Sequence, residues 1–124
     1  MLKSLIRADR YLFPPEKSFT RQLKRILGFR PRNIKLYQLA FVHKSASSFV
    51  FNDTKLNNER LEFLGDAILD SMVAEYLFRR FPDKEEGFLT QTRSKLVNRD
   101  NLNHLAIKLG IGEMIISKMS KDNH

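Results

Sequence analysis

The chain has 124 residues, of which 42% are hydrophobic and 29% charged, and it contains ten phenylalanines and no cysteine. This length and aromatic content fit one folded domain over residues 1–124 and exclude a disordered chain, while the lack of cysteine excludes disulfides and thiolate zinc sites. No apolar run resembles a signal peptide or nears the roughly 18 residues of a membrane span, so we expect a soluble, cytoplasmic protein without a membrane partner.

The net charge of +8 lies at the N-terminus. Residues 1–37 contain ten Lys or Arg and two acidic residues, whereas the remaining residues contain twelve basic and twelve acidic groups. A basic arm suits phosphate binding, because each neutralised phosphate releases counterions. Many basic helices are simply solvated faces, so charge alone makes nucleic acid a candidate partner and leaves the solvated face as an alternative.

Two helices are predicted in the first third of the chain. Pro14 and Pro15, followed by EKSFTRQLKRILGF, indicate the start of an amphipathic helix that ends at Gly28, within a basic helical arm of residues 1–30. Asn33 is a candidate N-cap for a helix in NIKLYQLAFVHKS, and a loop is expected around residues 45–55. The apolar faces of these helices comprise Phe19, Leu23, Ile26 and Leu27 in the first and Ile34, Leu36, Tyr37, Ala40 and Phe41 in the second.

The longest predicted helix covers about residues 57–80. Asn57 or Asn58 can cap its start, and it should end before Pro82, because a residue that precedes proline disfavours the helical conformation. One or two further helices should end at Gly110, followed by a short GEMIIS segment. No strand pattern is convincing, so the predicted fold class is all-α.

Four carboxylates share one face of the long helix. At about 100° per residue, Glu59, Glu62, Asp66 and Asp70 fall within about 80° of one another. An apolar stripe lies opposite and is expected to pack against the other helices. This stripe comprises Leu61, Leu64, Ile68, Met72 and Tyr76.

The commoner explanation of such an acidic stripe is the solvated side of an amphipathic helix. Two features favour a binding site instead. Glu62, Asp66 and Asp70 form like-charged i,i+4 pairs with no Lys or Arg among them, and Gly65 costs about 1 kcal/mol inside a helix relative to alanine. A hard divalent cation would offset the repulsion and prefers oxygen ligands, so the stripe is a candidate metal site.

The segment LNNERLEFLGDAILD, residues 56–70, resembles the signature segment of the ribonuclease III family. FVHKSAS upstream and EEGFLTQTRSKLVNRDNLNHLA downstream are similar to flanking blocks of the same family, so the resemblance covers about residues 33–115. The basic first thirty residues are less characteristic. The resemblance implies the all-α ribonuclease III endonuclease-domain fold.

The resemblance also implies an activity, a cofactor and partners. Members hydrolyse double-stranded RNA as homodimers with Mg²⁺, or Mn²⁺ as a substitute, leave 3' overhangs and process rRNA and mRNA. By the same resemblance Glu62 and Asp66 are catalytic metal ligands, and Glu59 is a catalytic residue near the active centre and the dimer seam. Phe63 matches an aromatic residue that packs into the partner subunit, with ordinary core packing as the alternative.

Three further residues match the downstream block. Glu86 matches a family glutamate with a supporting role, although it could equally belong to a solvated turn with its acidic neighbours. Arg93 and Lys95 are candidates for orienting the site or contacting RNA phosphates, and surface charge explains both equally well.

The sequence departs from the family pattern at its end. It reaches His124 without the second acidic pair of a complete catalytic domain and without a double-stranded-RNA-binding domain, so we expect an incomplete domain that is weak or inactive alone. A non-catalytic RNA-binding relative of the same fold is the main alternative. A small DNA-binding module is a third, but nothing marks a recognition helix.

Overall fold

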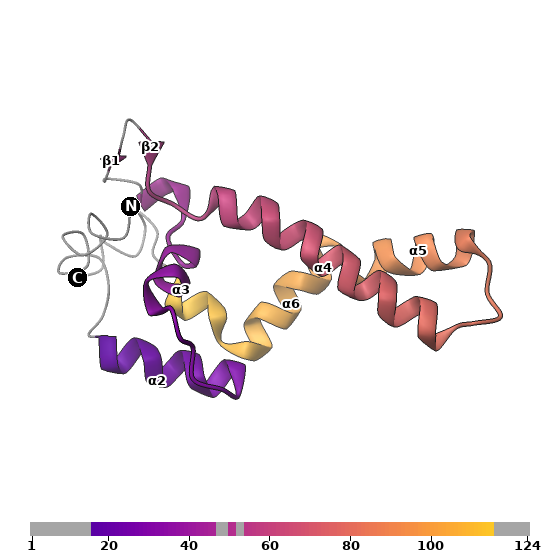
Figure 1. Ribbon diagram of the computed structural model, residues 1–124, viewed down its shortest axis with the longest axis horizontal. Coiled ribbons are helices and arrows are strands. Elements are labelled where there is room, and N and C mark those ends of the chain that lie inside the picture. The colour runs from indigo at the N-terminus through magenta and orange to yellow at the C-terminus, as the bar shows by residue number, and fades with distance from the viewer. Residues whose placement is uncertain (1–15, 47–49, 52–53, 116–124) are drawn as a thin grey trace. The chain divides into compact units, whose positions relative to one another are not determined.

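The computed structural model describes residues 16–46, 50–51 and 54–115. Pro14, Pro15 and the rest of the first half of the basic arm therefore lie outside the described residues, as does the chain after residue 115. The described residues belong to two compact units, one of residues 16–60 with 110–115 and the other of Leu61–Leu109. The elements labelled in Figure 1 are mainly helices, which confirms the all-α class.

The first helix, α2 (Glu16–Leu27), forms where the sequence predicts it. Phe19 and Leu23, one turn apart, are each 2% exposed and anchor its apolar face. Gly28 ends the helix in the left-handed conformation with φ +78°, and its N–H donates to the carbonyl of Lys24 at 2.9 Å. A residue without a side chain adopts this conformation at no steric cost, which explains the predicted stop.

The second helix, α3 (Ile34–Ala40), is shorter than predicted. The Asn33 side chain caps it by accepting from the N–H of Leu36 at 3.3 Å, as expected. The chain then turns at Phe41, so the residues Lys44–Ala46 form a separate 3-10 turn instead of continuing the helix. The predicted apolar face is therefore partly wrong, because Leu36 is exposed whereas Leu39 is buried.

The core of the first unit joins α2 to the end of α3. The rings of Phe19 and Phe41 meet edge to face with centroids 5.7 Å apart, a favoured aromatic geometry. Ile111 and Met114, from the short 3-10 helix Ile111–Met114, pack against the same cluster. Residues far apart in sequence thereby fix α2 in place.

Two short strands lie in the segment predicted as a loop. β1 (Val50–Phe51) and β2 (Thr54–Lys55) pair antiparallel, which the sequence did not indicate because two residues are too few to show alternation. After them, Asn58 donates from its backbone to Val42 and from its side chain to Ala40, at 2.9 and 3.0 Å. These bonds tie the start of the long helix to the end of α3.

The long helix, α4 (Glu59–Arg80), begins close to the expected residue 57 and ends before Pro82 as predicted. It is followed by α5 (Glu86–Leu96) and α6 (Arg99–Leu109), and Gly110 with φ +72° ends α6. Figure 1 shows α5 running back beside the second half of α4, and the rings of Phe81 and Phe88 meet edge to face at 5.3 Å near the turn. None of the described helices is long and apolar enough to cross a membrane.

The predicted packing face of α4 is wrong. Four residues of the expected stripe are more than half exposed, whereas Leu77 is only 1% exposed. Leu77 lies in line with the acidic stripe, and its neighbours Val73 and Ala74 are half-buried, because α5 returns along this side of α4. The exposed residues are Leu64, Ile68, Met72 and Tyr76.

Candidate active site

The carboxylates of Glu62 and Asp66 lie one turn apart on the same face of α4. Both side chains are exposed, and no hydrogen bond or ion pair within the part of the chain that the structure describes engages either carboxylate. Both carboxylates therefore retain their full capacity to bind a cation. No cation among the described residues forms an ion pair that compensates the like-charge repulsion between them, as the sequence predicts.

Glu59 is the first residue of α4. Its backbone N–H donates to the side-chain oxygen of Asn57 at 3.0 Å, so Asn57 supplies the capping bond predicted for Asn57 or Asn58. The positive end of the helix dipole stabilises a carboxylate in this first turn. The exposed carboxylate of Glu59 shares its helix face with that of Glu62, one turn further along.

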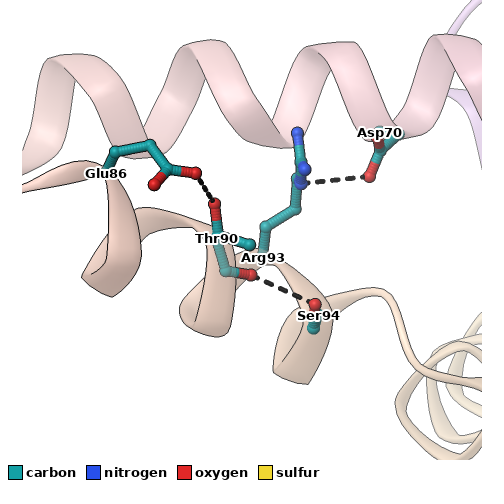
Figure 2. A network of polar contacts seen from close by, with 5 residues as sticks. All are labelled: Asp70, Glu86, Thr90, Arg93 and Ser94. Carbon is teal, nitrogen blue, oxygen red and sulfur yellow. Dashed lines mark hydrogen bonds and ion pairs between the residues drawn. The ribbon is translucent and has the colours of Figure 1, made fainter.

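Asp70, the fourth residue of the stripe, has a partner on another helix. Arg93 Nε on α5 lies 3.4 Å from Asp70 Oδ1, with 35% and 46% of the two side chains exposed (Figure 2). Solvent screening limits such a pair to about 1 kcal/mol or less. Helical spacing along α4 does not reveal this cation, because Arg93 is 23 positions away from Asp70 along the chain.

Glu86 is held by a hydrogen bond within α5. Its Oε1 accepts from Thr90 Oγ1 at 2.7 Å, and the Thr90 carbonyl accepts from Ser94 Oγ at 3.1 Å (Figure 2). This contact distinguishes Glu86 from Asp83 and Glu85, which are exposed in the preceding turn. Thr90 was not among the predicted site residues, although its i,i+4 spacing from Glu86 indicates that the two side chains can contact each other on a helix.

An open hollow of about 430 Å³ lies between α4 and α5. Leu77 and Phe78 line it from α4, and Glu86, Thr90 and Arg93 line it from α5. The structure thus brings Glu86 and Arg93 together with the second half of α4. Glu62 and Asp66 are not part of this hollow.

Two other predicted site residues, Lys95 and Phe63, are exposed. The backbone carbonyl of Lys95 accepts from the side chain of Asn98 at 3.0 Å and from that of Asn101, whereas its ammonium group has no ion pair among the described residues. Phe63 is 82% exposed beside the acidic stripe, which rules out core packing of this ring within the described chain.

Gly65 leaves open space beside Asp66. A Cβ atom added at Gly65 would meet no other atom within 4 Å, so packing within the described chain does not require glycine here. The glycine therefore leaves room for another molecule to approach the helix closely at this position.

The two carboxylates of Glu62 and Asp66 suit a magnesium ion that also binds a phosphate. The described residues contain no group of three or more acidic or histidine side chains placed to hold a metal. Mg²⁺ is nevertheless commonly held by one or two carboxylates, with waters and substrate phosphates completing its octahedral shell. The exposed pair Glu62 and Asp66 fits this arrangement.

Comparison with known proteins identifies the relatives of this chain. A family model described as ribonuclease-III-like matches residues 33–124. The ribonuclease 3 of Bacteroides fragilis is 46% identical over 124 residues, which are all of this chain and 43% of that protein. The ribonuclease 3 of Bacteroides thetaiotaomicron is 45% identical over the same 124 residues, which correspond to 40% of that protein's length. The chain therefore spans less than half the length of these relatives.

A solved structure resembles the chain in three dimensions. The nuclease domain of ribonuclease III from Campylobacter jejuni superimposes with a TM-score of 0.70 at 38% sequence identity, over 82% of this chain and 67% of that one. That structure is described as showing structural flexibility in the region involved in dimer formation.

Proposed function

Because the chain belongs to the ribonuclease-III-like family, we propose that it forms the larger part of a catalytic domain that hydrolyses double-stranded RNA. The observation that carries this proposal is the pair Glu62 and Asp66, which are exposed on one face of α4 and have no ion-pair partner among the described residues. Elsewhere on α4, the acidic residues Asp70 and Glu75 have ion-pair partners. A helix face that served only solubility would be more stable with charges of both signs, whereas Glu62 and Asp66 carry the same sign.

In this proposal Glu62 and Asp66 hold Mg²⁺, with Mn²⁺ as a substitute. The chemistry supplied by bound Mg²⁺ is Lewis-acid activation of the scissile phosphate and of the attacking water. The task of the two carboxylates is to position the cation and to balance its charge. Gly65 keeps the space beside Asp66 open for the RNA phosphate, and Glu59 extends the negative face by one turn.

The residues of α5 support the site in different ways. The bond from Thr90 limits the rotamers of Glu86, so that its carboxylate keeps a fixed direction. Arg93 sets α5 against α4 by its ion pair with Asp70 and acts as a positioning residue. Lys95 is an exposed cation without an ion pair in the described part of the chain, which suits contact with an RNA phosphate.

The remaining parts of the proposal concern assembly and products. We propose a homodimer in which Phe63 packs into the partner subunit, because large exposed aromatic side chains are enriched at such interfaces. The description of the Campylobacter jejuni domain, with its dimer-forming region, supports this assembly. Products with 3' overhangs, roles in rRNA and mRNA processing and a cytoplasmic location follow from the family resemblance and stay predictions.

The experiment is cleavage of a labelled RNA duplex in Mg²⁺ by four proteins. They are the 124-residue chain, a chimera that joins it to the remainder of the Bacteroides fragilis relative, and that chimera carrying Asp66→Asn or the matched control Asp83→Asn. We expect the chimera and the control to cut, the Asp66→Asn chimera not to cut, and the chain alone to cut weakly or not at all. If every protein binds the duplex and none cuts it, the chain is a non-catalytic RNA-binding relative.

A further inference from the structure

The basic residues of α2 lie on one side of the helix. Lys17, Arg21, Lys24 and Arg25, which we call the α2 basic face, fall within an arc of about 100° at the usual helical spacing. The buried residues Phe19 and Leu23 lie on the opposite side. The helix therefore turns its apolar side inward and all its positive charge outward.

Nothing in the described chain neutralises the α2 basic face. All four side chains are exposed, and no ion pair among the described residues involves any of them. Glu16 is the single acidic residue of α2, and the next loop adds the exposed cations Arg30 and Arg32. By contrast, Arg79 at the end of α4 pairs with Glu75 at 3.0 Å, which is typical of a solvated face with mixed charge.

We propose that the α2 basic face binds the phosphate backbone of an RNA duplex, as a contact surface distinct from the acidic face of α4. The inference rests on the proposed function for the identity of its ligand. Proteins recognise duplex RNA mostly through its shape, its phosphates and its 2'-hydroxyls, so a row of exposed cations suits this ligand. Lys17 and Arg25 are separated by about 12 Å of helix rise, enough to reach several phosphates of a densely charged duplex.

The packing of α2 argues against a membrane as the ligand. A basic amphipathic helix that binds a lipid surface inserts its apolar side between the acyl chains. Here that side is occupied, because Phe19 and Leu23 are each 2% exposed and the ring of Phe19 packs edge to face against that of Phe41. The basic face can engage a ligand without any change in this packing, whereas insertion would require the core of the first unit to open.

The test is a binding titration with a fluorescent 20-base-pair RNA duplex in EDTA, where magnesium-dependent cleavage cannot occur. The variant Arg21→Gln with Lys24→Gln removes two charges from the α2 basic face. The matched control, Arg99→Gln with Lys108→Gln, removes one Arg and one Lys from exposed positions of α6. Two duplexes of unrelated sequence are used, since backbone contacts carry no sequence information.

We expect the α2 variant to bind both duplexes about tenfold more weakly, with the slope of log K against log salt reduced by about 2, one for each lost phosphate contact. The control should keep the affinity and slope of the unmodified chain. The charge-preserving variant Arg21→Lys with Lys24→Arg should also bind normally. Far-UV circular dichroism checks that each variant keeps its helices.

Three results would overturn the inference: an α2 variant with unmodified affinity and slope, an equal loss in the α6 control, or a chain that binds phosphatidylserine vesicles and no RNA. The outcome is separable from that of the proposed function. If the α2 variant binds normally while Asp66→Asn abolishes cleavage by the chimera, the inference fails and the proposed function stands.

Discussion

The two halves of α4 present the same helix face in opposite ways. In the first half, Glu62 and Asp66 are exposed and have no partner among the described residues. In the second half, the face is covered by α5, so Asp70 pairs with Arg93 and Leu77 is buried. The second half of α4 packs against α5, whereas the carboxylates of the first half stay available to a ligand.

This difference distinguishes the two carboxylates of the proposed metal site from Asp70 better than their spacing along the helix does. Glu62, Asp66 and Asp70 are equally spaced along α4, so the sequence treats them alike. Of these three carboxylates, Asp70 is the one with an ion-pair partner among the described residues. A carboxylate that has an arginine partner is a poor candidate for binding a cation, because the arginine already balances its charge.

The largest expected effect is on catalysis. In the chimera with the Bacteroides fragilis remainder, Asp66→Asn should lower the cleavage rate by about 1,000-fold, which corresponds to about 4 kcal/mol of transition-state stabilisation. Asp70→Asn should lower it less than about tenfold, because Asp70 acts through Arg93. Single-turnover cleavage of a labelled duplex measures both rates. Similar losses for the two variants would erase the distinction between the halves of α4.

The next effect concerns the stability of the covered half. Leu77→Ala should cost about 3 kcal/mol, because it removes a fully buried side chain and leaves a cavity. Leu64→Ala makes the same chemical change at a position that is 55% exposed and should cost less than about 1 kcal/mol. Urea unfolding followed by circular dichroism compares the two. A larger loss at Leu64 would show that the exposed stripe is a packing face after all.

A smaller effect is expected for the ion pair between the helices. A double-mutant cycle of Asp70→Asn and Arg93→Gln should give a coupling energy of up to about 1 kcal/mol at low salt, because both side chains are partly exposed. The coupling should fall as salt screens the charges. The pair Glu75 and Arg79, within α4, provides a reference of about 0.4 kcal/mol. No measurable coupling would mean that packing alone holds α5 in place.

The smallest effect is expected at Thr90. Thr90→Val removes the hydroxyl that donates to Glu86 and should destabilise the chain by about 0.5 kcal/mol, because the bond is exposed to water. Its effect on cleavage by the chimera should be a few-fold decrease, since the Glu86 carboxylate gains rotamers. Thr90→Ser retains the hydroxyl and should restore the rate. A rate unchanged by Thr90→Val would remove Glu86 from the supporting residues.

Features that depend on neighbouring residues were predictable from the sequence. Gly28 and Gly110 end α2 and α6 in the left-handed conformation, and Asn33 caps α3. The alignment of the carboxylates on α4 was predictable for the same reason, because it depends only on helical geometry. Each of these features is decided within a few residues by backbone sterics or by one hydrogen bond.

Features that depend on how one helix packs against another were not predictable from the sequence. The buried face of α4 was assigned to the row from Leu64 to Tyr76, although α5 covers Leu77 instead. The hydrophobic pattern of α4 allows either face to pack, so the turn between the helices decides. Arg93 and Asp70 were each recognised as candidate residues, yet their pairing was not, since no local pattern links residues on two helices.

The exposed row from Leu64 to Tyr76 has a consequence for the behaviour of the chain in concentrated salt. Sulfate and other strongly hydrated anions are excluded from protein surfaces and strengthen the association of apolar side chains. The same ionic strength screens the α2 basic face from phosphates. Ammonium sulfate should therefore promote self-association through the exposed apolar row of α4 while it releases nucleic acid from the α2 basic face. A single step at high salt during purification should thus remove bound RNA and favour oligomers of the chain.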